Sequence, residues 1–184
     1  MYMINPQLLT LNRFEIRLAG KGGQGLIKSG LILAEALAAE GKRVLQLQSY
    51  GPEARGGASR SDVIIGDTSY PGVVSLDVLV ALSQEAYDKY LHLVKPNGIV
   101  IFDSDLVKPV LIEGINQHAV PFTRIAESLG NKLYANSVVI GYLVALTKLV
   151  SKETVKKVIC CRVPKSTVEN NLKAFEIGHS KWSR

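Results

Sequence analysis

The chain has 184 residues and a mass of 20.0 kDa, which is enough for one hydrophobic core and short for two. Apolar residues make up 47% and charged residues 21%, a globular composition that excludes a disordered or fibrous protein. Lys and Arg number 22 against 16 Asp and Glu, and the resulting charge of +6 favours anionic partners. The basic residues are scattered and have few aromatic neighbours, so a nucleic acid is not the expected partner.

The cysteines and the apolar runs restrict the compartment and the possible metal sites. Cys160 and Cys161 are adjacent, so they lack the two-residue spacing of iron-sulfur and zinc sites, and we expect reduced thiols in a cytoplasmic protein without a metal. The longest apolar run, 137–150, is too short to span a membrane, and no membrane is expected as a partner. Residues 1–12 lack a signal-peptide pattern and are interpreted as a flexible N-terminal arm before one domain, 13–184.

Strand and helix patterns alternate along the chain. The predicted strands are 14–18, 44–48, 62–65, 77–82 and 99–102, with shorter extended stretches at 109–112 and near Ala119. The predicted helices are 24–40 closed by Gly41, a segment up to Val94 capped by Ser83, 123–129, 137–150, and a last helix from a Ser166/Glu169 capping box to Gly178. Residues 95–98 are predicted to form a turn. This order predicts a single α/β domain with a largely parallel sheet covered by helices, and ligand sites at the carboxyl ends of the strands.

A glycine-rich segment follows the first predicted strand. Gly20, Lys21, Gly22, Gly23, Gln24 and Gly25 lead directly into a helix, where glycines permit tight turns and the first helical amides attract anions. A nicotinamide site would need an acidic residue about twenty positions later, but residues 45–49 contain none. Lys28 and Ser29 come two residues too late for a Walker loop. Simple close packing of helix on strand remains the alternative.

A second glycine-rich segment follows the second predicted strand. Tyr50, Gly51, Glu53, Arg55, Gly56 and Gly57 combine turn formers with a guanidinium suited to carboxylate or phosphate. The alternative is an exposed loop with solvated charges. Asn136, which precedes an apolar helix, is interpreted either as its N-cap or as a ligand contact.

Together, the two segments resemble the gamma subunit family of 2-oxoacid:ferredoxin oxidoreductases, whose domain is of the pyruvate/ketoisovalerate oxidoreductase gamma type. The resemblance rests on residues 20–25 and 49–57 and continues through 77–82, 97–98, 136–138 and 171–178. It covers nearly the whole chain after residue 12. Cys160, Cys161 and the final residues 181–184 are not features of that family.

The resemblance implies a subunit of an enzyme that converts a 2-oxoacid and coenzyme A into an acyl-CoA and CO2 while reducing ferredoxin. The complex would use thiamine diphosphate, Mg, iron-sulfur clusters and coenzyme A, held mainly by alpha, beta and ferredoxin-like delta subunits. This chain would be the non-redox gamma subunit, inactive alone and without a catalytic residue. Its expected role is to shape the active site and the coenzyme A channel, with cofactor contacts from Gly20, Gly22, Gly23, Gln24, Gly25, Tyr50, Gly51, Glu53, Arg55, Gly56, Gly57 and Asn136.

The substrate and the rival functions follow from the same segments. Residues 51–59 look most like those of the 2-oxoglutarate enzymes, which makes 2-oxoglutarate the expected substrate. Two alternatives stay open: a nucleotide- or flavin-binding oxidoreductase, and a structural assembly subunit without ligand contacts. Apolar surface meant for partners could also let the isolated chain form a homodimer.

Overall fold

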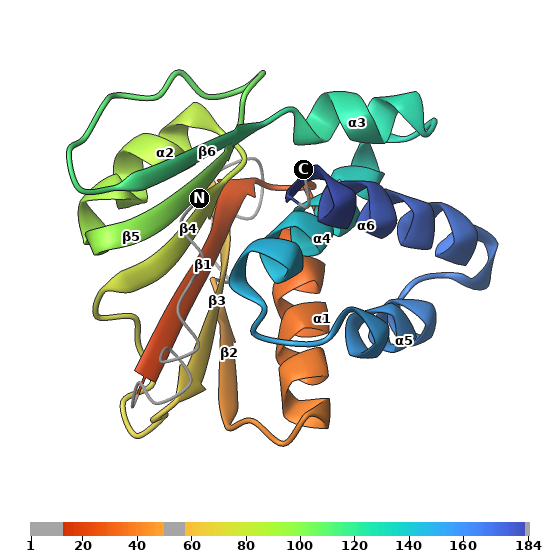
Figure 1. The fold of residues 1–184 in the computed structure, drawn as a ribbon, viewed down its shortest axis with the longest axis horizontal. Helices are drawn as coiled ribbons and strands as arrows, with labels where there is room; N and C mark the ends of the chain where they lie inside the picture. The colour runs from red at the N-terminus through yellow and green to blue at the C-terminus, as the bar shows by residue number, and fades with distance from the viewer. Residues whose placement is uncertain (1–12, 50–57, 183–184) are drawn as a thin grey trace.

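Six strands form one sheet in the order β2-β3-β1-β4-β5-β6 (Figure 1). The structure is a computed structural model that describes residues 13–49 and 58–182. All strands share one direction except β3, which runs antiparallel to both neighbours, β1 and β2. The predicted largely parallel sheet is therefore confirmed. The strands are β1 Arg13–Lys21, β2 Val44–Gln48, β3 Ala58–Gly66, β4 Leu76–Ala81, β5 Val94–Asp103 and β6 Asn116–Val120.

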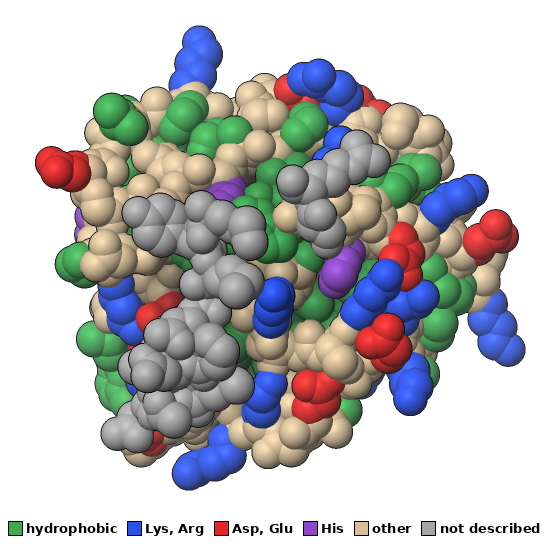
Figure 2. Space-filling model, viewed as in Figure 1, with side chains coloured by type: hydrophobic (Ala, Val, Ile, Leu, Met, Phe, Trp, Pro, Cys, Tyr) green, Lys and Arg blue, Asp and Glu red, His purple; other side chains and the backbone are tan. Residues whose placement is uncertain are grey.

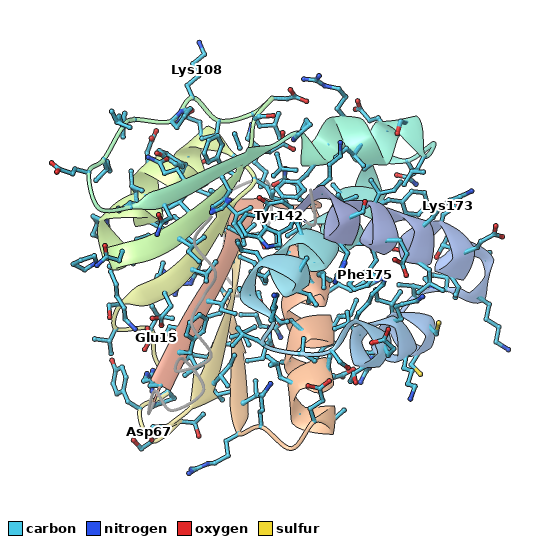
Figure 3. The ribbon with its side chains drawn as sticks, viewed as in Figure 1. Glu15, Asp67, Lys108, Tyr142, Lys173 and Phe175 are labelled. Carbon is cyan, nitrogen blue, oxygen red and sulfur yellow. The ribbon has the colours of Figure 1, made fainter. Side chains whose placement is uncertain are left out.

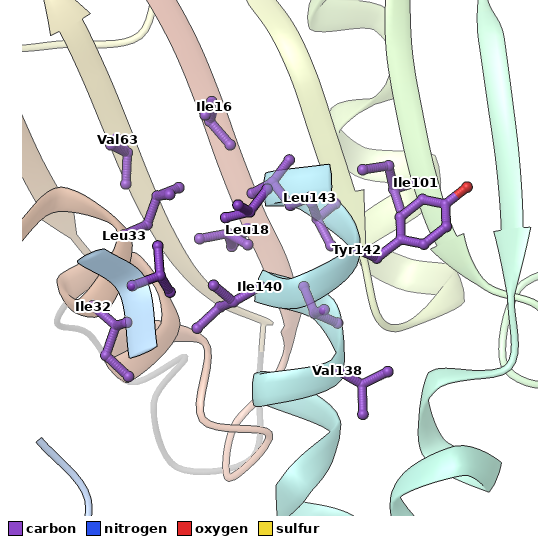
Figure 4. Close-up of a cluster of buried hydrophobic side chains, with 14 of the residues drawn as sticks. Ile16, Leu18, Ile32, Leu33, Val63, Ile101, Val138, Ile140, Tyr142 and Leu143 are labelled. Atoms are coloured by element: carbon purple, nitrogen blue, oxygen red, sulfur yellow. The ribbon is translucent and has the colours of Figure 1, made fainter. Parts of the chain in front are cut away.

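Helices cover both faces of this sheet unequally. Helix α2, Gln84–Tyr90, packs on one face and continues into a 3-10 turn, Leu91–Leu93. The opposite face carries the larger core, part of which is drawn in Figure 4. It is covered by α1 Leu26–Ala39, α3 Phe122–Ser128, α4 Ala135–Thr147, α5 Lys152–Arg162 and α6 Val168–Trp182, with 3-10 turns at Lys132–Tyr134 and Lys165–Thr167.

The two cores divide the central strands residue by residue. Ile16, Leu18 and Val80 belong to the larger core, whereas Ala19 and Ala81 belong to the α2 side. Successive side chains of a strand point to opposite faces, so a strand buried on both faces is apolar along most of its length. This explains why 78–82 is an uninterrupted apolar run, whereas in 14–18 the apolar residues alternate with two charged residues that are themselves buried.

A close contact between α4 and α6 corrects the predicted end of the last helix. Gly178 does not end α6, which continues to Trp182. A Cβ at Gly178 would collide with the carbonyl of Val138, and one at Gly141 would collide with the carbonyl of Phe175. The two glycines therefore let the helix backbones touch, and Gly178 serves this tertiary contact rather than a cap.

Helix α5 was missing from the sequence prediction. Only Val155 and Ile159 are buried in it, so its apolar stripe is narrow. Ser151 caps the helix by accepting a hydrogen bond from the Thr154 amide at 3.3 Å. Ion pairs fix it at both ends: Lys152 and Lys156 bind Glu176 of α6, and Arg162 binds Glu35 of α1. Cys160 and Cys161 are exposed thiols on this helix.

Other local differences concern turns and caps. Residues 95–98 form a bulge inside β5, where Asn97 has φ 62° and the register against β4 shifts, rather than a turn before the strand. The stretch 109–112 is not a strand, and α6 is entered through the 3-10 turn Lys165–Thr167, so Ser166 lies within that turn rather than at the helix boundary. Gly41 with φ 79° follows α1, and Ser83 caps α2, as predicted.

A buried ion pair ties β1 to β3. Arg17 donates from Nε and Nη2 to the two carboxylate oxygens of Asp62 at 2.7 and 2.8 Å, directly across the antiparallel pair. The Arg17 guanidinium also lies 4.5 Å from the ring centroid of Tyr90. Both charges are paired, as buried charges must be, and the fork geometry fixes the register of β3 against β1.

An aromatic cluster joins β6 to the C-terminal helix. His118 Nδ1 lies 3.1 Å from the hydroxyl of Tyr142, which is labelled in Figures 3 and 4, and the His118 ring is 5.3 Å from that of Trp182. Burial lowers the pKa of His118, because desolvation penalises the protonated ring.

The glycine contact gives a first prediction. Replacing Gly178 with Ala should lower the free energy of unfolding by about 1–3 kcal/mol, because the added methyl group forces α6 away from α4. Helix propensity alone predicts the opposite, a rise in the free energy of unfolding of up to about 1 kcal/mol, because alanine favours a helix more than glycine does. Urea denaturation measures the difference, with Ser180→Ala at an exposed position of the same helix as control. A stabilised Gly178→Ala protein would show that the helices do not touch there.

The histidine cluster gives a second prediction. A histidine whose pKa is lowered by folding stabilises the fold fully above its unfolded pKa of about 6.5, and this contribution is lost as the pH falls below that value. His118→Gln should therefore reduce the loss of unfolding free energy between pH 7.5 and pH 5. Denaturation at both pH values tests this, and an unchanged pH slope would contradict it.

Candidate functional site

A cavity of about 780 Å³ opens at the carboxyl ends of the parallel strands. Its walls come from segments that follow β1, β4, β5 and β6 and from the start of α4. The lining residues are Lys21, Gly22, Gly23, Gln24, Leu82, Ser83, Gln84, Glu85, Leu106, Thr123, Glu127, Lys132, Leu133 and Ala135. Ligand sites of open α/β sheets lie at this edge, as the sequence predicted for the first glycine segment.

The chain leaves β1 and β4 toward opposite faces of the sheet. After β1 it enters α1 on the face of the larger core, and after β4 it enters α2 on the other face. β1 and β4 are neighbours, so the two connections diverge and leave a crevice between them. The cavity lies at this switch point, which is where such folds bind ligands.

The glycine segment forms a tight turn against the end of β4. The side-chain oxygen of Gln24 accepts from the Lys21 amide at 2.6 Å, and its Nε2 donates to the carbonyl of Leu82 at 2.9 Å. Gly23 has φ 88°, a left-handed conformation that glycine adopts without strain, and open space surrounds the position of a Cβ there. Gly23 therefore has the backbone conformation of a tight turn, for which the sequence predicts a glycine.

The starts of α1 and α4 meet behind this turn. Gly25 precedes α1 with φ 77°, and a Cβ there would lie 2.7 Å from Nδ2 of Asn136. Asn136 is therefore not the N-cap of α4: the helix begins at Ala135, and the side chain of Asn136 packs against Gly25 instead. The first amides of a helix lack intrahelical partners and carry a partial positive charge, so two such ends lie near the cavity.

The second glycine segment, with Tyr50, Gly51, Glu53, Arg55, Gly56 and Gly57, lies outside the described residues. Its flanks do not: Ala58 pairs with Lys21 across β3 and β1, and the Ser49 amide donates to the Arg60 carbonyl at 3.2 Å. The chain therefore leaves β2 and re-enters β3 at the edge that carries the first glycine turn.

The cavity is lined by equal numbers of lysines and glutamates, and two of its hydroxyl groups form hydrogen bonds within the fold. Two lysines, Lys21 and Lys132, face two glutamates, Glu85 and Glu127. The Ser83 hydroxyl caps α2, and that of Thr123 donates to Asp103 at 2.7 Å. The lining thus offers main-chain groups and lysines for binding, and its hydroxyls serve the fold.

The described residues form neither a metal-binding cluster nor a membrane-spanning helix. Within 13–49 and 58–182, no group of three or more His, Cys, Asp or Glu side chains is placed to hold a metal ion. No helix in this part of the chain is both long and apolar enough to cross a membrane.

The sheet order bears on the nucleotide alternative. In a dinucleotide-binding unit the first two strands of the chain are adjacent, and an acidic residue near the end of the second reaches the ribose. Here β3 separates β1 from β2, and β2 ends in Gln46, Leu47 and Gln48. The glycine pattern therefore lacks the setting of a nicotinamide site.

Comparison with known proteins identifies the family. The family model described as pyruvate ferredoxin/flavodoxin oxidoreductase matches residues 15–181, and the chain belongs to this family. The 2-oxoglutarate synthase subunit KorC of Methanocaldococcus jannaschii is 49% identical over 173 residues, 91% of this chain and 92% of the relative. The ketoisovalerate oxidoreductase subunit VorA of Methanothermobacter thermautotrophicus is 33% identical over 92% of this chain and 36% of its own length.

Solved structures agree. The gamma subunit of a keto/oxoacid ferredoxin oxidoreductase from Geobacter sulfurreducens PCA has a TM-score of 0.82 and 46% identity, covering 92% of this chain and 98% of that chain. A 2-oxoglutarate:ferredoxin oxidoreductase from Magnetococcus marinus, with 2-oxoglutarate, coenzyme A and succinyl-CoA bound, has a TM-score of 0.85 and 27% identity. The match covers 94% of this chain and 31% of the Magnetococcus chain. The resemblance found in the sequence is confirmed.

The turn gives a third prediction. Gly23→Val should impair turnover of the assembled enzyme because a β-branched residue is strained at φ 88°, whereas Gly23→Asn should impair it less because asparagine tolerates this region. Steady-state kinetics of complexes with each variant test this. Equal, unimpaired kinetics in both would leave the turn with a packing role only.

Proposed function

We propose that the chain is the non-redox, gamma-type subunit of a thiamine diphosphate-dependent 2-oxoacid:ferredoxin oxidoreductase. The complex would decarboxylate 2-oxoglutarate oxidatively with coenzyme A, giving an acyl-CoA and CO2 and reducing ferredoxin. The observation that carries the proposal is the 49% identity to a 2-oxoglutarate synthase subunit, which extends over nearly the whole of both chains. The glycine turn at the switch point of the sheet supplies a site consistent with it.

In this proposal the chain contributes position and electrostatic field. Gly22 and Gly23 line the cavity, and Gly20 and Gly25 flank them at the end of β1 and the start of α1; coenzyme A phosphates or a carboxylate would bind at this turn. Arg55 of the second glycine segment would add a guanidinium, and Tyr50 and Glu53 would lie along the same channel. Thiamine diphosphate, held by the partner chains, would supply the carbanion-stabilising chemistry of the complex. No residue of this chain is assigned a proton transfer or a nucleophilic attack.

The proposed partners are alpha, beta and ferredoxin-like delta subunits, with ferredoxin as electron acceptor, in the cytoplasm. The ketoisovalerate relative and the Magnetococcus enzyme each carry the matching segment in a chain about three times as long, so there the domain is joined covalently to other parts. Thiamine diphosphate, Mg and the clusters are assigned to the partner chains.

The cavity rim suggests where partners bind. Leu106 is 42% exposed and Leu133 is 50% exposed, and both line the cavity. Apolar side chains beside a polar site are typical of a surface that a partner covers. Elsewhere, basic and acidic side chains are interspersed, as Figure 2 shows for the face that carries α5 and α6.

The substrate assignment gives a fourth prediction. A complex reconstituted with this chain should show a higher kcat/KM for 2-oxoglutarate than for pyruvate or branched 2-oxoacids, because this ratio reports differential binding of the transition states. Ferredoxin reduction with each 2-oxoacid measures it. A preference for pyruvate would overturn the substrate while leaving the family membership intact. Absence of turnover with every 2-oxoacid would overturn the function itself.

A further inference from the structure

The Gln24 side chain is engaged at both ends by main chain on either side of the switch point. Its oxygen accepts from Lys21 at the end of β1, and its nitrogen donates to Leu82 just after β4. The Gln24 amide also donates to the Lys21 carbonyl at 3.3 Å, so main chain and side chain close the same turn. One carboxamide therefore joins the glycine turn to the neighbouring strand.

Few side chains could replace it. The contact needs an acceptor and a donor on one planar group, and an ionised carboxylate accepts only. The space is reserved by Gly20, because a Cβ there would collide with Gln24 Oε1 and would lie 3.1 Å from Leu82 Cβ. The glycine and the glutamine thus depend on each other.

We propose that Gln24 is a positioning residue: it holds the turn 21–24 against the end of β4 and does not itself contact the ligand. This revises the sequence interpretation of Gln24 as a cofactor contact. Its consequence for catalysis rests on the proposed function, in which this turn borders the coenzyme A channel. Gly22 and Gly23 then present main chain to the cavity in a conformation that the Gln24 side chain fixes.

Gln24→Met tests the geometric part, since it keeps a side chain of similar length and removes both hydrogen bonds. Hydrogen exchange of the isolated chain should quicken at least roughly tenfold at the amides of 20–25, because two hydrogen bonds that hold the turn are lost. The matched control is Gln117→Met. Gln117 also accepts one hydrogen bond, from the Tyr87 hydroxyl at 2.7 Å, and donates another, to Val110 at 2.7 Å, but it does not line this cavity.

The assembled enzyme tests the catalytic part. In complexes with Gln24→Met, the KM for coenzyme A should rise several-fold while the KM for the 2-oxoacid stays within about twofold, and Gln117→Met should change neither. Gln24→Glu adds a pH readout: the introduced carboxyl can donate to Leu82 only when protonated, so its defect should shrink as the pH falls, whereas that of Gln24→Met should not.

The exchange and kinetic measurements distinguish failure of the positioning role from failure of the proposed function. Unchanged exchange in Gln24→Met would refute positioning. A raised KM for coenzyme A with unchanged exchange would make Gln24 a direct ligand contact, which also overturns the proposal. If the wild-type complex shows no coenzyme A-dependent turnover, the proposed function fails, and the exchange experiment still decides whether Gln24 holds the turn.

Discussion

The turn after β1 passes through a narrow space between the end of β4 and the start of α4. A side chain at Gly20 would collide with Gln24. A Cβ added at Gly25 would lie 2.7 Å from Nδ2 of Asn136. This close approach brings the first turns of α1 and α4 together at one edge of the sheet. The cavity, its main-chain wall and its favourable field for anions all depend on it.

The direction of β3 is the second constraint on the site. By running antiparallel between β1 and β2, β3 starts beside the glycine turn, where Ala58 pairs with Lys21. The Arg17–Asp62 ion pair fixes the register of that pairing. The same insertion separates β1 from β2, which removes the setting of a dinucleotide site although the glycine spacing imitates one.

Local patterns predicted the parts of the fold that local physics determines. The buried strands, the Ser83 cap and the end of α1 at Gly41 follow from apolar runs, capping and positive φ, and the structure has them. The polar helix α5 was missed because only Val155 and Ile159 of it are buried, an apolar stripe too narrow to produce a helical pattern in the sequence. Gly178 was misread because its role is a contact with a helix about forty residues earlier.

The sequence predicted one wall of the candidate site but not the walls that face it. Residues 20–25 could be placed at a carboxyl edge because a strand, glycines and a helix follow one another along the chain. The opposing walls, from Leu82, Leu106 and Leu133, carry no motif and are brought there by tertiary packing. Asn136 was interpreted as an N-cap or a ligand contact; it is not the N-cap of α4, because its side chain packs on Gly25, a tertiary contact that no local pattern indicates.

We propose that the glycine turn borders the coenzyme A site of an assembled 2-oxoacid oxidoreductase. Hydrogen exchange of the complex with and without coenzyme A measures this contact. Exchange at the amides of residues 20–25 should slow when coenzyme A is added to the complex. Protection confined to other segments, with exchange at 20–25 unchanged, would contradict it.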